Sequence, residues 1–190
     1  MPNWVTNVLH LTQDGKPLDE TNPALLDEIK DYVRGTDIGE DGEVIAFDFN
    51  NIVPQPEGLY EQGSVEVTVA MKADGQPWIS NMPAWYEWNV EHWGTKWNVS
   101  WAGVGNNTFS FDTAWSTPEP VIKALSQKFP SVTFTVEFAD EDVGGGNCGT
   151  YEFEAGECLG FTEGTEKWAR EFLGYEEEDE EEYEEEDTNG

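Results

Sequence analysis

The chain has 190 residues, 40 acidic and nine basic, so its formal net charge at neutral pH is −31. This charge argues against direct binding to nucleic acid or to an anionic membrane, because both need basic patches, and it favours basic partners. No apolar run reaches the ~18 residues of a membrane-spanning helix. The N-terminus lacks the basic region and cleavage site of a secretory signal, so we expect a protein of the cytoplasm.

The N-terminal part of the chain predicts a strand followed by a helix. Residues 4–11 alternate in polarity, as strands do, and the turn at residues 14–17 ends the run. Asn22 and Pro23 provide a helix cap and a proline at the first helical position. An apolar stripe continues this helix towards Arg34 and Gly35, and it consists of Leu25, Leu26, Ile29, Tyr32 and Val33. After a loop over residues 36–43, residues 44–49 predict a short strand.

The middle of the chain contains five tryptophans within residues 85–101. Trp85, Trp88 and His92 recur at helical spacing, which predicts a short helix ending at Gly94. From residue 96 to residue 102 the period changes to that of a strand. Residues 50–82 look like an insertion outside the core, with a hairpin strand at residues 64–71 before a turn at residues 73–75.

The C-terminal half predicts a strand at residues 108–114, paired with residues 96–102 as a hairpin. A helix then starts at residues 116–119 and ends before Pro130. The strands that follow cover residues 132–138 and 149–154, separated by the glycine turn at residues 144–146. Thr162 is the expected cap of a last helix that extends to about Leu173.

These elements predict an α+β fold with the ferredoxin-like, split βαβ order. Without the insertion the order is strand, helix, strand, strand, helix, strand, which gives an antiparallel sheet with helices on one face, plus a C-terminal strand and helix. We expect one domain over residues 1–174 and a disordered acidic tail over residues 175–190. Residues 176–187 hold 11 of the carboxylates, and the other 29 against nine basic residues leave the body at −20.

Several segments resemble the YubB-like family of phage and plasmid proteins. They include FDFNNIVPQP at residues 47–56, WGTKW at residues 93–97, and TAWS at residues 113–116 followed by TP. The resemblance covers roughly residues 3–160. It implies a ferredoxin-like domain and an origin on phages, plasmids or related mobile elements, and it implies little chemistry. The long acidic tail and the acidic body depart from the family pattern.

No catalytic group, metal site or cofactor site is predicted. Cys148 and Cys158 are expected to be reduced thiols, with a disulfide across a hairpin as the less favoured alternative. His92 has no nucleophile at a recognisable spacing. Lys96 is expected to lie against an aromatic ring or to pair with a carboxylate such as Asp112. Tryptophans 85, 88, 93, 97, 101 and 115 suggest either core packing, which we favour, or a stacking platform for a ligand.

Two acidic clusters are the candidate partner-binding residues. The first lies on the first helix and its following loop, and it comprises Asp27, Glu28, Asp31, Asp37, Glu40, Asp41 and Glu43. The second lies at the end of a strand and comprises Glu137, Asp140, Glu141 and Asp142. Carboxylates on a rigid scaffold can imitate the phosphates of a duplex, whereas the simpler interpretation is a solvated acidic surface.

The leading hypothesis is therefore an inhibitor from a mobile element. It would bind a basic, nucleic-acid-binding host defence protein, such as a restriction or CRISPR effector, as a nucleic-acid mimic. The alternative is a structural or adaptor module that binds its partner through hydrophobic contacts, with acidity serving only solubility. An enzyme acting on a small molecule has little support, because the few cations offer little to hold phosphates.

Overall fold

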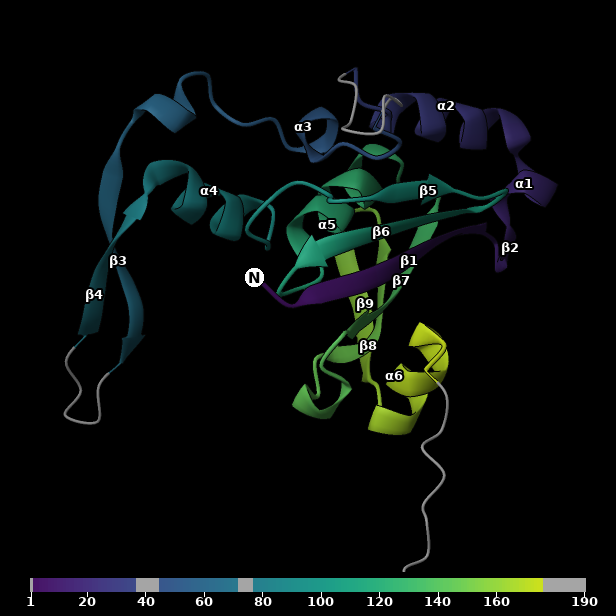
Figure 1. Ribbon diagram of the computed structural model, residues 1–190. Helices are drawn as coiled ribbons and strands as arrows, with labels where there is room; N and C mark the ends of the chain where they lie inside the picture. Colours follow the sequence, from purple (N-terminus) through teal and green to yellow (C-terminus); the bar gives the residue numbers. More distant parts are fainter. Residues whose placement is uncertain (1, 37–44, 72–76, 176–190) are drawn as a thin grey trace, which may run out of the picture.

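The computed structural model describes residues 2–36, 45–71 and 77–175. It is built on one large antiparallel sheet (Figure 1). The strands of this sheet lie in the order β5 (Ala102–Val104), β6 (Thr108–Ala114), β1 (Trp4–Gln13), β7 (Thr133–Asp140), β8 (Cys148–Glu154) and β9 (Glu157–Glu163), and the short β2 (Lys16–Pro17) pairs with β1.

The helices are α1 (Leu18–Thr21), α2 (Pro23–Val33), α3 (Phe49–Ile52), α4 (Ala84–His92), α5 (Glu119–Lys128) and α6 (Glu166–Leu173). The predicted cap of α2 is confirmed, because the Asn22 side chain accepts a hydrogen bond from the Leu25 N–H. With α2 before β5 and α5 before β7, the order β5-β6-β1-β7 confirms the predicted ferredoxin-like fold. Strands β8 and β9 extend this sheet beyond β7.

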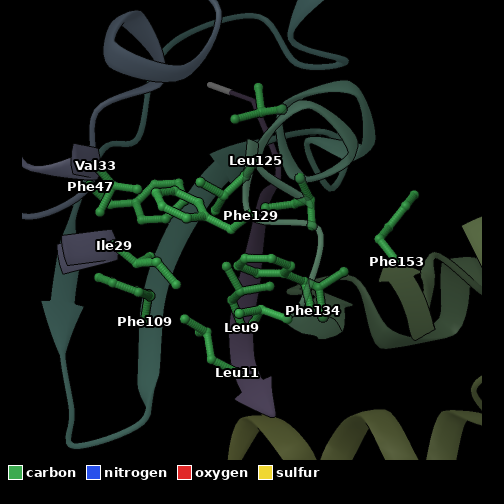
Figure 2. Packing of buried hydrophobic residues seen from close by; sticks show 14 of the residues in the cluster. Leu9, Leu11, Ile29, Val33, Phe47, Phe109, Leu125, Phe129, Phe134 and Phe153 are labelled. Atoms are coloured by element: carbon green, nitrogen blue, oxygen red, sulfur yellow. The ribbon is translucent and has the colours of Figure 1, made fainter. Parts of the chain in front are cut away.

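The main core lies between the sheet and the pair α2 and α5. Leu9 and Phe134 from the sheet pack in this core with Ile29 of α2 and Leu125 of α5 (Figure 2). Phe47, from the loop after α2, fits among them. A smaller cluster on the opposite face joins α6 to the end of the sheet, through Ala139, Cys148 and Ala169. Among the described residues, no other helix covers the face of the sheet beside α6, and we call this face the open face.

The strand predicted for residues 96–102 is wrong except at its end, because β5 contains only Ala102–Val104. Polar side chains compete with strand pairing here. Asn98 Oδ1 accepts hydrogen bonds from the Phe49 and Val99 N–H groups, at 3.1 and 3.0 Å, and Asn98 Nδ2 donates to Asp48 Oδ1 at 2.8 Å. The segment is thereby fixed to the start of α3 as a loop.

The short strand predicted for residues 44–49 is also wrong over the residues described. The Asp48 N–H donates to the Val33 carbonyl, and Asp48 Oδ1 accepts from the Asn50 N–H at 2.9 Å, which caps α3. Phe47 and Phe49 nevertheless have no exposed surface. The alternating pattern therefore marked burial correctly but not a strand.

The region predicted as an insertion contains a hairpin of β3 (Ser64–Met71) and β4 (Pro77–Pro83), as expected, beside α4 and the 3₁₀ turn η1 (Leu59–Glu61). Figure 1 shows this hairpin projecting away from the main sheet. In the described part of the chain, β3 and β4 pair only with each other. The domain limits stay predictions, and the predicted tail beyond residue 175 lies outside the described residues.

Strand β9 was not predicted, and the expected cap at Thr162 is wrong by three residues. Thr162 lies in β9 opposite Thr150, and the cap of α6 is Thr165, whose side chain accepts from the Trp168 N–H at 3.2 Å.

Thr165→Ala is expected to lower the free energy of unfolding by about 1 kcal/mol, because it leaves a helix N–H without its partner. Thr162→Ala is the matched control and should change stability by less than about 0.5 kcal/mol, since Thr162 is exposed. Urea unfolding of the two variants measures both values. Equal losses would contradict this assignment of the cap.

Candidate functional site

Two segments that carry the family resemblance, residues 93–97 and 113–116, meet at the end of β6. The buried Thr95 donates from Oγ1 to the Ala114 carbonyl at 2.7 Å. Ser116 Oγ donates to the Gly94 carbonyl at 2.5 Å. Side-chain hydroxyls therefore hold the segment after α4 against the turn that leads into α5.

A buried polar network fixes this turn from β1. Asn7 Nδ2 donates to Thr113 Oγ1 at 2.9 Å, and Thr117 Oγ1 donates to Asn7 Oδ1 at 2.6 Å. The Thr113 hydroxyl in turn donates to the Ser116 carbonyl at 2.8 Å. Asn7 and Thr113 have no exposed surface, and Thr117 has little. Such a satisfied network specifies one backbone path for the turn.

This turn presents Trp115 at the surface in an unfavourable backbone conformation. Its φ is +73°, in the left-handed region that bulky residues avoid, at a cost of about 1–3 kcal/mol. The Trp115 N–H donates to the Asn3 carbonyl at 3.0 Å, and Asn147 Nδ2 donates to the Trp115 carbonyl at 2.8 Å. The side chain is 42% exposed. The fold thus holds a strained residue whose ring faces solvent.

Lys96 lies among aromatic rings beside Trp115, which confirms the first of the two roles predicted for it. Its Nζ is 4.2 Å from the ring centroid of Trp97, 4.9 Å from that of Trp115 and 6.0 Å from that of Tyr86. Contacts of this kind contribute about 0.5–1 kcal/mol each at exposed sites. Asp112, the carboxylate suggested as its partner, instead accepts from Thr6 Oγ1 at 3.0 Å.

Aromatic contacts continue on both sides of Lys96. From the insertion, Tyr60 stacks on Trp85, and the neighbouring Tyr86 makes an edge contact with Trp115. On the other side of Lys96, Trp97 contacts Trp4 of β1 at 6.2 Å. We call this set of rings the aromatic row, and it comprises Tyr60, Trp85, Tyr86, Trp115, Trp97 and Trp4.

The favoured prediction for the tryptophans, core packing, holds for Trp93 but not for all six. Trp93 is 1% exposed, and its Nε1 donates to the Val53 carbonyl at 2.8 Å. Trp101 and Trp115 are instead exposed. Sequence spacing did not separate these cases, because the strand expected at residues 96–102 is a loop.

The open face of the sheet carries a line of carboxylates. Asp112 of β6 is paired with Thr6 of β1, and Glu137 of β7 is paired with Val8 of β1. Thr135 of β7 is paired with His10 on one side and with Glu152 of β8 on the other. Glu154 continues the line by one more step along β8. We call Asp112, Glu137, Glu152 and Glu154 the carboxylate diagonal, because in the register of the sheet they lie in turn at the levels of residues 6, 8, 10 and 12 of β1.

Some members of the carboxylate diagonal have local partners. Glu137 Oε2 lies 2.8 Å from His10 Nε2, and Glu154 Oε2 accepts from Thr133 Oγ1 at 2.6 Å. Burial raises the pKa of Asp112, the Thr6 hydrogen bond opposes this rise, and the charge of Glu141 adds to it. Asp112, Glu137 and Glu154 are thus held by side-chain contacts on the sheet.

The predicted acidic clusters do not form one surface. Asp27, Glu28 and Asp31 are exposed on α2, whose opposite side is buried in the main core. Glu137 faces away from that core, because its neighbours Val136 and Phe138 face into it. The sheet and the core therefore separate the two sets. The remaining members of the first cluster, Asp37, Glu40, Asp41 and Glu43, lie outside the described residues.

Within the second cluster, Asp140 has a structural role. It is 7% exposed, and its carboxylate accepts from Asn3 Nδ2, Asn147 Nδ2 and the Asp142 N–H. Glu141 is exposed and accepts from the Trp4 N–H at 2.8 Å. Asp142 is exposed at the start of a 3₁₀ turn. Clustering along the chain was thus a poor guide to which carboxylates share a surface.

Glu152 and Glu154 were not predicted as members of an acidic surface. Their signal was alternation within the strand expected at residues 149–154, where they lie opposite to the Tyr151 and Phe153 side. To place these two glutamates on the same surface as Glu137, the pairing of this strand with β7 must be known, and sequence spacing did not show that pairing.

The possible metal ligands and the two cysteines are arranged as follows. Among the described residues, no group of three or more histidine, cysteine or acidic side chains could hold a metal ion. Cys148 and Cys158 are both free, the first buried and the second exposed. They lie near opposite ends of the β8–β9 hairpin, where Cys158 is paired with Phe153. Burial, and then the charge of Glu163, raises the pKa of the Cys148 thiol.

The fold and its surface define an acidic α+β protein of ferredoxin-like topology. The chain belongs to the family of Api92-like proteins, because the family model described as the ferredoxin-like domain in Api92-like protein matches residues 93–188. A crystal structure of protein Api92 from Yersinia pseudotuberculosis is similar, with 13% sequence identity and a TM-score of 0.44.

That similarity covers 64% of this chain and 41% of the Api92 chain, so this chain spans less than half of that protein. No curated protein matches the sequence. Among the described residues, no helix has the length and apolar character needed to cross a membrane.

Proposed function

We propose that this protein comes from a phage or another mobile element and acts in the host cytoplasm as an inhibitor. Its target is a basic, nucleic-acid-binding defence protein, such as a restriction or CRISPR effector, which it binds in place of nucleic acid. The observation that carries this proposal is the carboxylate diagonal on the open face of the sheet. The family resemblance seen in the sequence supports the mobile-element origin.

The geometry of the carboxylate diagonal suits a basic cleft. Strands lie about 4.8 Å apart and residues rise by about 3.3 Å, so the four carboxylates extend over roughly 25 Å. Among the described strands His10 is the one basic side chain on the open face beside them. A partner with a groove of lysines and arginines meets a fixed row of negative charge there, which provides specificity and fast association.

The test compares two charge-removing variants of the full chain. The first carries Glu137→Gln, Glu152→Gln and Glu154→Gln on the open face. The matched control carries Asp27→Asn, Glu28→Gln and Asp31→Asn on α2, and it removes the same number of charges. A further control replaces the carboxylates of residues 176–187 by amides, which separates the body from the tail.

We expect the wild-type chain and the α2 control to retain one nucleic-acid-binding host protein, and duplex DNA and rising salt to release it. The open-face variant should bind that protein at least about tenfold more weakly. A complex whose affinity does not depend on salt, or one in which the host protein binds duplex DNA at the same time, would contradict the proposal. Equal losses in the open-face variant and the α2 control would contradict the assignment to the open face.

A second candidate function is an adaptor that binds its partner through the aromatic row. The exposed ring of Trp115 on a strained backbone favours it, because large aromatic side chains are common anchors of protein interfaces. Trp115→Ala should then reduce binding at least about tenfold while the open-face variant binds normally. The opposite pattern supports the inhibitor that acts as a mimic.

A further inference from the structure

Strand β9 forms one edge of the main sheet. The strand order ends at β9, and every residue from Glu157 to Glu163 is exposed. Two of these residues are large and apolar, with Leu159 56% and Phe161 48% exposed. An edge of this kind presents unpaired backbone groups together with apolar side chains, which is the surface that strand addition uses.

The backbone groups that point outward can be identified. The Gly164 N–H donates to the Cys148 carbonyl of β8 at 3.0 Å. In an antiparallel ladder, alternate residues direct their N–H and C=O groups to the same side. The N–H and C=O groups of Thr162 therefore also face β8, whereas those of Phe161 and Glu163 point away from β8. No strand of the described residues lies on that outer side.

The side chains along this edge have a defined arrangement. Phe161 lies 4.5 Å from Tyr151 and 6.4 Å from Phe138, measured between ring centroids, so its ring extends an aromatic surface to the edge. Glu157 and Glu163 stand at the two ends of the strand. Opposite Glu152 and Phe153 the register shifts and leaves Leu159 unpaired, which limits the regular edge to a few residues.

The charges of Glu157 and Glu163 disfavour a second copy of the chain as the strand that pairs with the β9 edge. Antiparallel pairing of two β9 strands about Gly160 would place Glu157 of each opposite Glu163 of the other. Like charges directly opposite are destabilising, and each chain has a net charge of −31. The same two glutamates attract a strand with cationic ends.

We propose that β9 is a docking edge for a short extended segment of another protein, which adds to the sheet as a further strand. The segment has apolar residues that contact Phe161 and Leu159, and lysine or arginine near the positions opposite Glu157 and Glu163. Main-chain hydrogen bonds to residues 161 and 163 supply the register. This inference does not depend on the carboxylate diagonal, which lies on the open face.

The experiment uses the full chain and the capped peptide Lys-Thr-Val-Thr-Val-Thr-Lys as a probe. Amide hydrogen exchange is measured by NMR with and without the peptide. At saturation we expect exchange of the Phe161 and Glu163 amides to slow at least about tenfold. Exchange of the Gly164 amide should change little, because this N–H already donates a hydrogen bond to the Cys148 carbonyl. A peptide with glutamate in place of both lysines should not bind.

Two N-methylated peptides test the backbone contacts without altering the protein. One is methylated at both valine amides and the other at all three threonine amides, so each loses donors on one edge only. We expect one of them to bind like the parent peptide and the other to lose at least about tenfold in affinity. Equal binding by both, binding without protection of the two amides, no binding at millimolar peptide, or a β9-paired dimer without peptide would each overturn the proposal.

Discussion

Phe47→Ala is expected to lower the free energy of unfolding by about 3–5 kcal/mol, the usual cost of truncating a fully buried phenylalanine. Phe47 lies in an irregular segment, yet it has no exposed surface. Its ring stacks on Phe111 at 4.8 Å and makes edge contacts with Phe109 at 5.2 Å and Phe49 at 6.1 Å. Removing it leaves a cavity between β6 and the α2 side of the core that these rings cannot fill by small shifts.

Urea unfolding followed by tryptophan fluorescence measures this loss. Phe161→Ala is the matched control, because the same atoms are removed from a residue that is half exposed at the sheet edge. Its loss should be about 1 kcal/mol. If the two variants lost similar stability, the central position of Phe47 in the core would be wrong.

Asn7→Ala is expected to cost about 2–3 kcal/mol, because it leaves buried polar groups without partners. The amide of Asn7 donates to Thr113 Oγ1 and to the carbonyls of Val5 and Phe111, and its carbonyl accepts from Thr117 Oγ1. Alanine supplies none of these contacts. Because the same network fixes the turn, we also expect the NMR signal of the Trp115 indole N–H to shift.

A double-mutant cycle with Thr117→Val separates the network from ordinary side-chain loss. Thr117→Val alone should cost about 1 kcal/mol, and the double variant should lose less than the sum of the two single changes. Strict additivity would show that Asn7 and Thr117 do not act together. Thr6→Ala, which removes a partner of Asp112 on the open face, should leave the NMR signal of the Trp115 indole N–H unchanged.

The regular elements show where sequence patterns suffice. The strand at residues 4–11, the helices α2, α4 and α5, and the hairpin of β3 and β4 follow from alternation, helical periodicity and turn residues. Residues 96–102 and 44–49 have a strand pattern without forming strands. Their conformation depends on hydrogen bonds from Asn98 and Asp48 to residues distant in the chain, which local propensity does not register.

The candidate surfaces depended still more on tertiary structure. Proximity in sequence grouped Asp140 with Glu141 and Asp142. Asp140, however, is buried, and its carboxylate accepts three hydrogen bonds within the protein. The other predicted cluster, on α2, lies on the far side of the core from Glu137. The carboxylate diagonal joins residues that are far apart in the chain, and only strand register brings them to one face.

The order of most elements, and hence the ferredoxin-like class, could be predicted from the amino-acid sequence, because hydrophobic period and turn chemistry are local properties. The sequence also placed Lys96 against aromatic rings. Which tryptophans are exposed, which carboxylates share the open face and which strand forms the edge depend instead on how distant segments pair. Those features arise from pairing between distant segments, and their free energy comes from contacts that no single stretch of sequence contains.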